Sequence, residues 1–252
     1  MRVLRFVTTC AIFVFGVFLL VSSSSSQAET IVDNAIYAEL LEKYLQDGVV
    51  NYEGLKTEET RLDQYLALLD QTDPDALARN EQFAFYMNAY NAYTLKLIVE
   101  HYPVKSIKDI GGLFKSPWKI KFCKVGGETL TLDDIEHNIL RPRFQDARVH
   151  FAINCAAKDC PPLISVPYQG AMLDQQLDAN TRAFLNNPAK TYLDGDTLWV
   201  SSIFKWFGED FNKDPLSFVL TYAEGDFKQR LEDAKDRIKV KYLKYDWSLN
   251  GQ

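Results

Sequence analysis

The sequence predicts an α+β fold: a single globular domain whose helical N-terminal part surrounds a central buried helix, which packs on a small mixed or antiparallel sheet. Two observations predict this class. Apolar residues recur at helical spacing through most of the N-terminal part. Short strands in hairpins are scattered through the rest and do not alternate regularly with helices. Because the chain shows no internal repeat and no linker, we expect one domain over residues 29–252.

The expected elements follow from periodicity and from helix and turn signals. Residues 49–55 are expected to form an extended link after Asp47-Gly48, and residues 148–154 a buried strand. The run Arg141-Pro142-Arg143 is expected to end a short helix that begins after Thr131. The remaining expected elements are helices over 29–48, 57–69, 75–101, 104–110, 131–140, 170–187, 215–222 and 227–231, hairpins over 118–130 and 191–200, and a strand over 238–243.

Residues 1–28 have the pattern of a secretory signal peptide. Arg2 and Arg5 precede an apolar run, and a serine tract leads to Ala28 with small residues suited to cleavage. A retained membrane anchor is the alternative, but the apolar run is short for a span and no positive flank follows it. We therefore expect an exported protein, periplasmic or secreted.

The charge balance narrows the classes of partner. The chain carries 28 Lys and Arg against 34 Asp and Glu, a formal charge of −6. Loss of the signal peptide removes two arginines and no acid, which makes the mature charge about −8. An acidic protein without a basic run is poorly suited to nucleic acid or anionic membrane surfaces. We expect a small-molecule, peptide or envelope substrate, no nucleic acid, and no membrane after cleavage; the oligomeric state stays open.

The helix expected over residues 75–101 is apolar almost all round between Phe83 and Val99, which is typical of a central helix. Its polar exceptions, Glu81, Asn88 and Asn91, fall on one helical stripe. A buried asparagine must find hydrogen-bond partners. These asparagines either tie loops to the core or orient a catalytic histidine.

The stretch VHFAINCAAKDCPPL (149–163) holds one of three histidines and two of four cysteines. A cysteine nucleophile needs a base or a positive field to form its thiolate. Alternation along a strand would send the side chains of His150 and Cys155 to opposite faces, which favours His137 as the base. The resulting hypothesis is a cysteine-dependent hydrolase or acyl transferase acting on an amide or ester. Its residues are Cys155 as nucleophile, His137 or His150 as base, and Asn88, Asn91 or Glu136 as orienting group.

A disulfide is the alternative for the same cysteines. Export leaves Cys123, Cys155 and Cys160, an odd number in an oxidising compartment, so at most one intramolecular disulfide forms. Either Cys155 pairs with Cys160 across a small turn, or Cys160 pairs with Cys123. The first pairing suits a non-catalytic periplasmic binding or scaffold domain. Thiol redox chemistry is a further alternative, although no C-x-x-C motif is present.

Metal binding finds little support in the sequence. His137, His150, Glu136 and a cysteine could converge, but their spacing matches no zinc motif. We therefore expect no metal and no cofactor.

Six segments together resemble the domain of unknown function family 547, found in exported bacterial proteins. They are NEQFAFYMNAYNAYTLKLI, TLDDIEHNILR, VHFAINCAAKDCPPL, DANTRAFLNN, SSIFKWFGEDF and YDWSLN, and the resemblance spans about residues 75–250. The resemblance identifies a family but implies no particular reaction. By motif position it marks Asn88, Asn91, Glu136, His137, His150, Cys155, Cys160, Lys205 and Trp206. The aromatic segment that holds Lys205 and Trp206 either lines a cleft or packs in the core with Lys205 in solvent. Cys123 lies outside the motifs.

Overall fold

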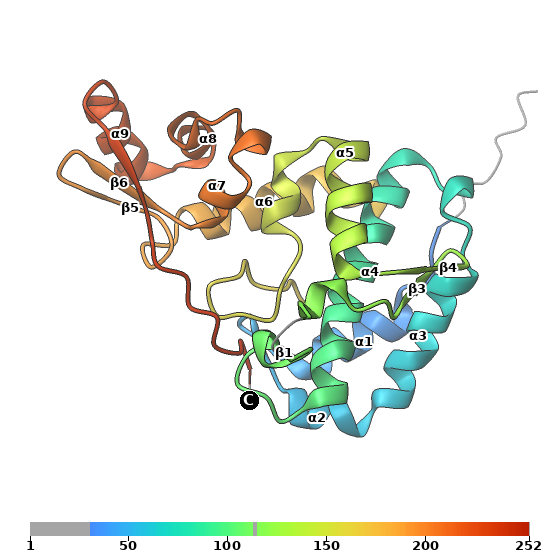
Figure 1. Ribbon diagram of the computed structural model, residues 1–252. Helices are drawn as coiled ribbons and strands as arrows, with labels where there is room; N and C mark the ends of the chain where they lie inside the picture. Colours follow the sequence, from blue (N-terminus) through green and yellow to red (C-terminus); the bar gives the residue numbers. More distant parts are fainter. Residues whose placement is uncertain (1–30, 113–114, 252) are drawn as a thin grey trace, which may run out of the picture.

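The computed structural model describes residues 31–112 and 115–251. The signal peptide expected over residues 1–28 lies outside them. Among the described residues, no helix combines the length and the apolar character that crossing a membrane requires. Helices dominate, accompanied by three small sheets, which confirms the predicted α+β class (Figure 1).

The N-terminal part is a group of helices around α4, the central helix. These helices are α1 (Ala35–Tyr44), α2 (Tyr52–Thr57), α3 (Glu59–Gln71) and α4 (Arg79–His101). Every residue of α4 from Glu81 to Val99 is buried, as its all-round apolar sequence predicts. Its packing partners include α2 and α3. The hairpin of β3 and β4 packs on α3.

The sheets are short and separate. Strands β1 (Leu45–Gln46) and β2 (Val49–Val50) form one antiparallel hairpin, and β3 (Cys123–Val125) and β4 (Glu128–Leu130) form another. In the third sheet, β6 (Thr197–Val200) pairs antiparallel with β5 (Tyr192–Asp194) and parallel with β7 (Lys239–Tyr242). The expected hairpins near residues 126 and 195 and the late strand are present.

The extended link predicted for residues 49–55 is wrong. Asp47 and Gly48 both have positive φ angles, 50° and 79°, and form the two-residue turn of a β-hairpin. Asn51 then accepts a hydrogen bond from the Gly54 backbone N–H and begins α2. The Asp47-Gly48 pair therefore reverses the chain between two strands. Aspartate and glycine favour such a turn as strongly as they favour the end of a helix.

The remaining helical elements are mostly short. They are η1 (Pro74–Ala76), η2 (Ile107–Asp109), η3 (Pro117–Lys119), the π-helix η4 (Asp134–Leu140), α5 (Arg141–Phe144), η5 (Ala147–Phe151), η6 (Gly170–Met172), α6 (Leu173–Leu185), α7 (Ile203–Trp206), η7 (Gly208–Phe211), α8 (Pro215–Tyr222) and α9 (Gly225–Ala234).

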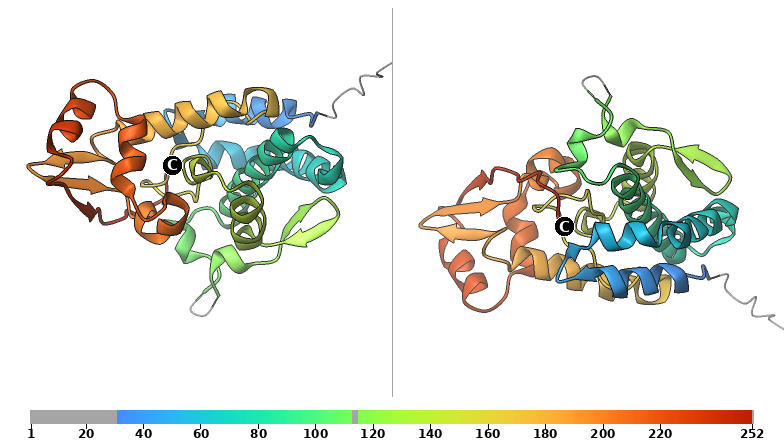
Figure 2. Two further views of the ribbon diagram at one scale, coloured as in Figure 1. Left: turned by 90° about the horizontal axis from the view of Figure 1, so that it is seen from above. Right: turned by 90° about the horizontal axis from the view of Figure 1, so that it is seen from below.

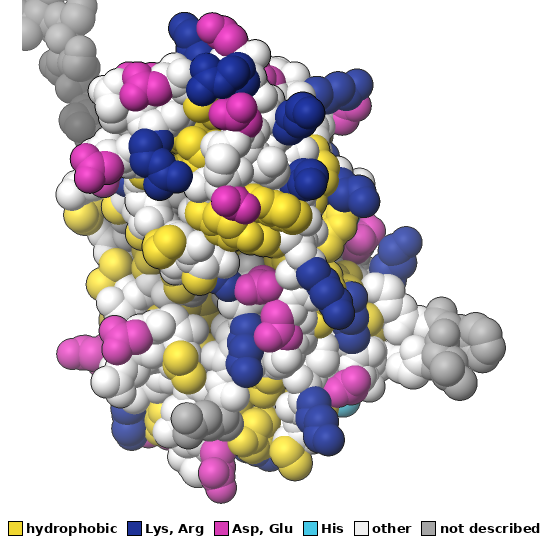
Figure 3. All heavy atoms as spheres, turned by 90° about the vertical axis from the view of Figure 1, so that its left-hand side faces the viewer, with side chains coloured by type: hydrophobic (Ala, Val, Ile, Leu, Met, Phe, Trp, Pro, Cys, Tyr) yellow, Lys and Arg dark blue, Asp and Glu magenta, His cyan; other side chains and the backbone are white. Residues whose placement is uncertain are grey.

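In the part of the chain that the structure describes, two apolar clusters make up the interior. The larger surrounds α4, and the smaller lies between the three-stranded sheet and α8 and α9. The ribbon views place that sheet with α8 and α9 at one end of the molecule and α1 to α4 at the other (Figures 1 and 2). On the face seen from the left of Figure 1, apolar side chains gather near the middle, with charged side chains around them (Figure 3).

The segment that holds His150 joins these clusters and is not a strand. It forms the 3-10 helix η5, because the Asp146 side chain accepts from the Arg148 backbone N–H and caps its start. Val149 packs in the larger cluster and Phe151 in the smaller one. The alternating apolar pattern therefore reflects a short helix between two cores, not the two faces of a sheet.

The C-terminal segment also spans the two clusters. After β7 it returns along the molecule, and Leu249 packs in the larger cluster. The Lys158 N–H donates to Ser248 O and the Asn250 N–H donates to Ala156 O. These bonds fix the segment against the loop that follows η5.

Candidate functional site

A cleft of about 210 Å³ opens beside η5. Elements from many parts of the chain line it, including η4, α7 and the C-terminal segment. Its lining mixes aromatic rings, carboxylates, imidazoles and two sulfur atoms. The lining residues are Tyr90, Ser116, Trp118, Asp133, Glu136, His137, His150, Ile153, Cys155, Cys160, Pro161, Ile203, Trp206, Phe207, Tyr245 and Trp247.

A capped helix delivers Glu136 and His137 to the cleft. The Thr131 N–H donates to the Asp134 carboxylate, and the Asp134 N–H donates to Thr131 Oγ1, the reciprocal pattern of a capping box. The sequence predicted this start correctly, but the helix does not end at Pro142. It continues as α5 to Phe144, because Pro142 occupies the first turn of α5, where the missing N–H is tolerated.

Asp210 organises the polar side of the cleft. Its Oδ2 accepts from His150 Nε2 at 2.6 Å and from Arg141 Nε at 2.6 Å, while its Oδ1 accepts from Arg141 Nη2 at 3.0 Å. Burial by itself would raise the pKa of Asp210, but the bonds from His150 and Arg141 outweigh it and hold the pKa below its ordinary value. The carboxylate is therefore ionised at neutral pH and fixes both partners.

The His150 imidazole is almost fully enclosed. Its ring stacks on Phe207 with centroids 4.0 Å apart, and only 1% of its side chain is exposed. Burial lowers its pKa, and the Asp210 carboxylate opposes that effect. A neutral His150 donates through Nε2 to Asp210, which leaves its Nδ1 as the unprotonated nitrogen.

Arg141 connects this pair to the second histidine. Its Nη1 donates to His137 Nδ1 at 2.8 Å. A guanidinium has no acceptor, so the neutral His137 carries its proton on Nε2, which lies 3.7 Å from Asp133 Oδ1. Burial lowers the pKa of His137, and its side chain remains 36% exposed. His137 is thus the more accessible of the two imidazoles, with its Nε2–H as a donor.

Glu136 is a buried acid at the same cleft. Burial raises its pKa to about 7, against the opposing charge of Arg141. Because only 8% of the residue is exposed, water compensates little for the charge of its ionised form. Near neutral pH this carboxyl can therefore both accept and donate a proton.

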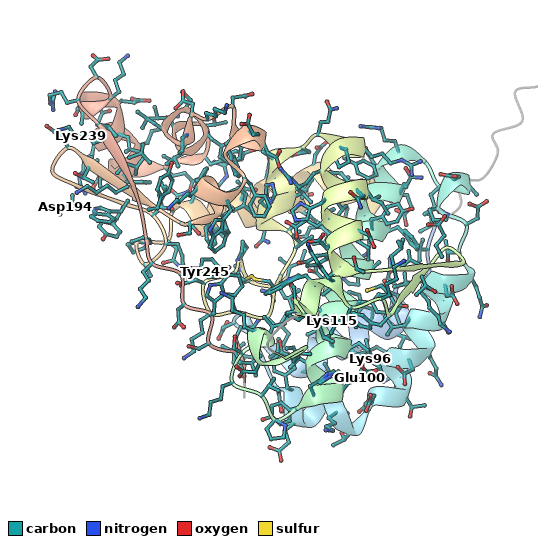
Figure 4. All side chains as sticks on the ribbon, viewed as in Figure 1. Lys96, Glu100, Lys115, Asp194, Lys239 and Tyr245 are labelled. Carbon is teal, nitrogen blue, oxygen red and sulfur yellow. A yellow bond between two sulfur atoms is a disulfide. The ribbon has the colours of Figure 1, made fainter. Side chains whose placement is uncertain are left out.

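Cys155 and Cys160 form a disulfide on the cleft wall, the first of the two pairings left open by the sequence. Cys155 Sγ lies 3.5 Å from the Tyr245 hydroxyl, and Figure 4 shows Tyr245 on the C-terminal segment. A sulfur in a disulfide is no thiolate, so the nucleophile expected at Cys155 is absent from this state. Cys123 is a free, buried thiol whose pKa is raised by burial.

The expectation that His150 and Cys155 point to opposite faces is wrong. It followed from alternation along a strand, and η5 is a helix. The two residues line the same cleft, as does His137.

The structure places the two asparagines of α4 in loop-tying positions. Asn88 donates to Tyr168 O and accepts from the Tyr168 N–H. Asn91 donates to Ala152 O and accepts from the Asn154 N–H. Both side chains are thereby engaged with the backbone, so the orienting role goes instead to Asp210 and Arg141.

The motif SSIFKWFGEDF contributes more than the sequence indicated. Trp206 lines the cleft with 46% of its surface exposed, whereas Lys205 is exposed and lies outside the lining. Sequence reasoning singled out this motif but missed its Asp210, and it also missed Arg141 and Tyr245. The motif holds three charged residues, Lys205, Glu209 and Asp210, and no signal in the sequence distinguished Asp210 from the other two.

Within 31–112 and 115–251, no group of three or more His, Cys, Asp or Glu side chains is placed to hold a metal ion. The polar groups of the cleft are instead held by hydrogen bonds to one another.

One comparison with known proteins gives a match. Residues 74–185 match the family described as "Protein of unknown function, DUF547". The matched segment contains Glu136, His137, Arg141, His150 and the disulfide, and it ends before Asp210 and the aromatic residues of α7 and the C-terminal segment. Neither the curated proteins nor the solved structures give a match.

Proposed function

Because this chain belongs to the DUF547 family, which is described as a family of unknown function, we propose a function from the cleft itself. The protein is an exported hydrolase that acts on an amide or ester by acid–base chemistry. Its substrate is a small molecule, a peptide or an envelope component that enters the aromatic cleft. The main support for this proposal is that a buried carboxyl, Glu136, and two histidines held by hydrogen bonds line the same cleft.

Acid–base hydrolysis needs one group that takes a proton from water and one that returns it to the leaving group. Catalytic groups work best when their pKa lies near the operating pH, and burial brings the pKa of Glu136 to about 7. His137 provides a more exposed hydrogen-bond donor through its Nε2–H. The concentration of perturbed acids and bases in one apolar cleft is typical of an active site.

Glu136 takes a proton from a water molecule as its oxygen attacks the carbonyl carbon, and the protonated Glu136 then protonates the departing oxygen or nitrogen. His137 donates a hydrogen bond through its Nε2–H to the carbonyl oxygen, where negative charge develops. Asp210 and Arg141 position both imidazoles, because each histidine uses one ring nitrogen on this pair. Ring nitrogens that are fixed in this way lose little entropy when they act.

A panel of uncharged, cationic and anionic esters and amides tests the proposal, with hydrolysis followed by release of the acid. We expect Glu136→Gln and His137→Ala each to reduce kcat/KM by about 10²-fold or more. Glu128→Gln on β4 and His101→Ala at the end of α4 are matched controls, because both residues are exposed and outside the cleft. A panel without turnover, or equal losses in the controls, would contradict the proposal and favour a binding or scaffold domain.

A second candidate keeps the cysteine as nucleophile in the reduced protein. It is favoured by one observation, that Cys155, His137 and His150 line the same cleft. Reduction would give a Cys155 thiol in the same cleft as two imidazoles, of which His150 has an unprotonated Nδ1. Rapid alkylation of Cys155 after mild reduction, slowed by His137→Ala or His150→Ala, supports this candidate. Hydrolysis that continues in a Cys155→Ser variant excludes it and leaves the acid–base mechanism.

A further inference from the structure

Four aromatic side chains form a continuous wall along the cleft. Trp206 and Tyr245 have ring centroids 4.8 Å apart, and Tyr245 and Trp247 have centroids 4.6 Å apart. Trp118 meets Trp247 nearly edge-on, with centroids 5.6 Å apart and planes inclined by 73°. The wall joins η3, α7 and the C-terminal segment, which lie far apart in the sequence. Such a wall offers the electron-rich faces of several rings to a ligand.

The lining of the cleft includes acidic side chains. Asp133 and Glu136 line it, and none of its described lining residues is a lysine or an arginine. Arg141 lies behind the histidines, with its guanidinium engaged by Asp210 and His137. Since the lining offers no cation to an anionic ligand, an anion gains little here, whereas a cation meets both the aromatic faces and the Asp133 carboxylate.

The chain itself already places a cation against this wall. The Lys108 ammonium lies 3.6 Å from the ring centroid of Trp247. Partial burial lowers the pKa of Lys108. A ring of the wall thus holds an ammonium group that has lost part of its hydration, which is the condition in which cation–π attraction is strongest.

We propose that the cleft recognises a substituted ammonium group, and that the substrate of this protein carries one beside the bond that is hydrolysed. The inference rests on the proposed function for the second part only. Trp206, Tyr245 and Trp118 provide the aromatic surface, since the Lys108 ammonium already lies against Trp247, and Asp133 provides the compensating charge. A volume of about 210 Å³ suits a compact head group such as trimethylammonium.

Binding is tested with two probes of the same shape. Choline carries a trimethylammonium group, and 3,3-dimethylbutan-1-ol carries an uncharged tert-butyl group in its place. Calorimetric titration of the oxidised protein should give an affinity for choline about tenfold higher than for the alcohol. Equal affinities, or no binding of choline, would overturn the inference.

Two variants locate the binding. Trp206→Leu should weaken choline binding about fivefold or more, and Asp133→Asn should weaken choline binding while leaving that of the alcohol nearly unchanged. Trp199→Leu is the matched control, because Trp199 lies on β6 outside the cleft. Circular dichroism confirms that each variant folds. Unchanged choline affinity in Trp206→Leu and Asp133→Asn, or an equal loss in Trp199→Leu, would contradict this location.

A pair of substrates separates this inference from the proposed function. Acetylcholine and 3,3-dimethylbutyl acetate have the same shape and the same ester. We expect kcat/KM about tenfold higher for acetylcholine. Hydrolysis of both at equal kcat/KM keeps the proposed function and rejects the cationic preference. Choline binding without hydrolysis of either ester keeps the ammonium site and rejects the hydrolase.

Discussion

His150 and Asp210 are separated by 60 residues in the sequence, yet His150 Nε2 and Asp210 Oδ2 lie 2.6 Å apart. Arg141 shares the same carboxylate through two hydrogen bonds and reaches His137 with its remaining nitrogen. A single carboxylate therefore positions both histidines of the cleft, one directly and one through a guanidinium.

Asp210→Asn should disturb both histidines at once. The change removes the negative charge that Arg141 and His150 share, and the hydrogen bonds to a charged group are worth about 2 kcal/mol of stability. Because the pKa of Asp210 is depressed in the folded protein, its contribution is present above the pKa of an unfolded aspartate and is lost as the pH falls further. We expect urea unfolding at pH 7 to show the loss. Glu209→Gln, at an exposed neighbouring position, should show none.

Glu136→Gln should stabilise the protein at high pH. A glutamate in the unfolded chain ionises near pH 4.5, whereas the folded group holds its proton to about pH 7. Folding stability from this group is therefore complete at low pH and declines as the pH rises from about 4 to 7. The variant should gain up to about 3 kcal/mol over the wild type at pH 8 and little at pH 4. Urea unfolding across this range measures the difference. A constant difference between variant and wild type would show that Glu136 does not titrate as inferred.

Reduction of the disulfide should lower stability by a modest amount. The bond closes a loop of only six residues, for which the chain-entropy relation gives about 2 kcal/mol. We expect a lower Tm in the presence of dithiothreitol and in Cys155→Ser/Cys160→Ser. Thiol labelling with mass spectrometry checks the pairing. In the oxidised native protein no cysteine of the described residues should react quickly, because Cys123 is buried and its pKa is raised. Fast labelling of Cys155 without a reductant would contradict the pairing.

Asn91→Ala should cost more than an ordinary surface change. The side chain bonds the backbone of Ala152 and Asn154, and truncation leaves both buried groups unpaired. At about 1–3 kcal/mol for each of the two unsatisfied groups, we expect a loss of about 2–6 kcal/mol in urea unfolding. Asn138→Ala is the control, because Asn138 is exposed and bonds only Asp134. Similar losses in the two variants would show that Asn91 does not hold the loop.

Several features of this protein were accessible from the sequence because they depend on local chemistry. Thr131 and Asp134 predicted a helix start, and Gly126-Gly127 predicted a hairpin turn. The all-round apolar pattern after Phe83 predicted the central helix. In each case, residues within one or two turns of each other determine the structure, so no distant contact is needed to infer it.

Where the sequence misled, one local pattern was compatible with more than one structure. The alternation around His150 resembled a strand, but Asp146 caps a 3-10 helix there and two separate cores accept Val149 and Phe151. Pro142 resembled a helix end, but it lies in the first turn of a new helix. Both patterns are compatible with two structures, and only packing distinguishes them.

By itself, the sequence determined the α+β class, the central helix and the group of motifs that contains most of the reactive residues. Only the tertiary structure decided which of these residues meet. It brought Tyr245 and Trp247 to the cleft, placed Asp210 against His150, joined Cys155 to Cys160, and engaged Asn88 and Asn91 with the backbone. The physical reason is that side-chain chemistry and local periodicity are properties of short segments, whereas a site depends on the distances between segments that fold together.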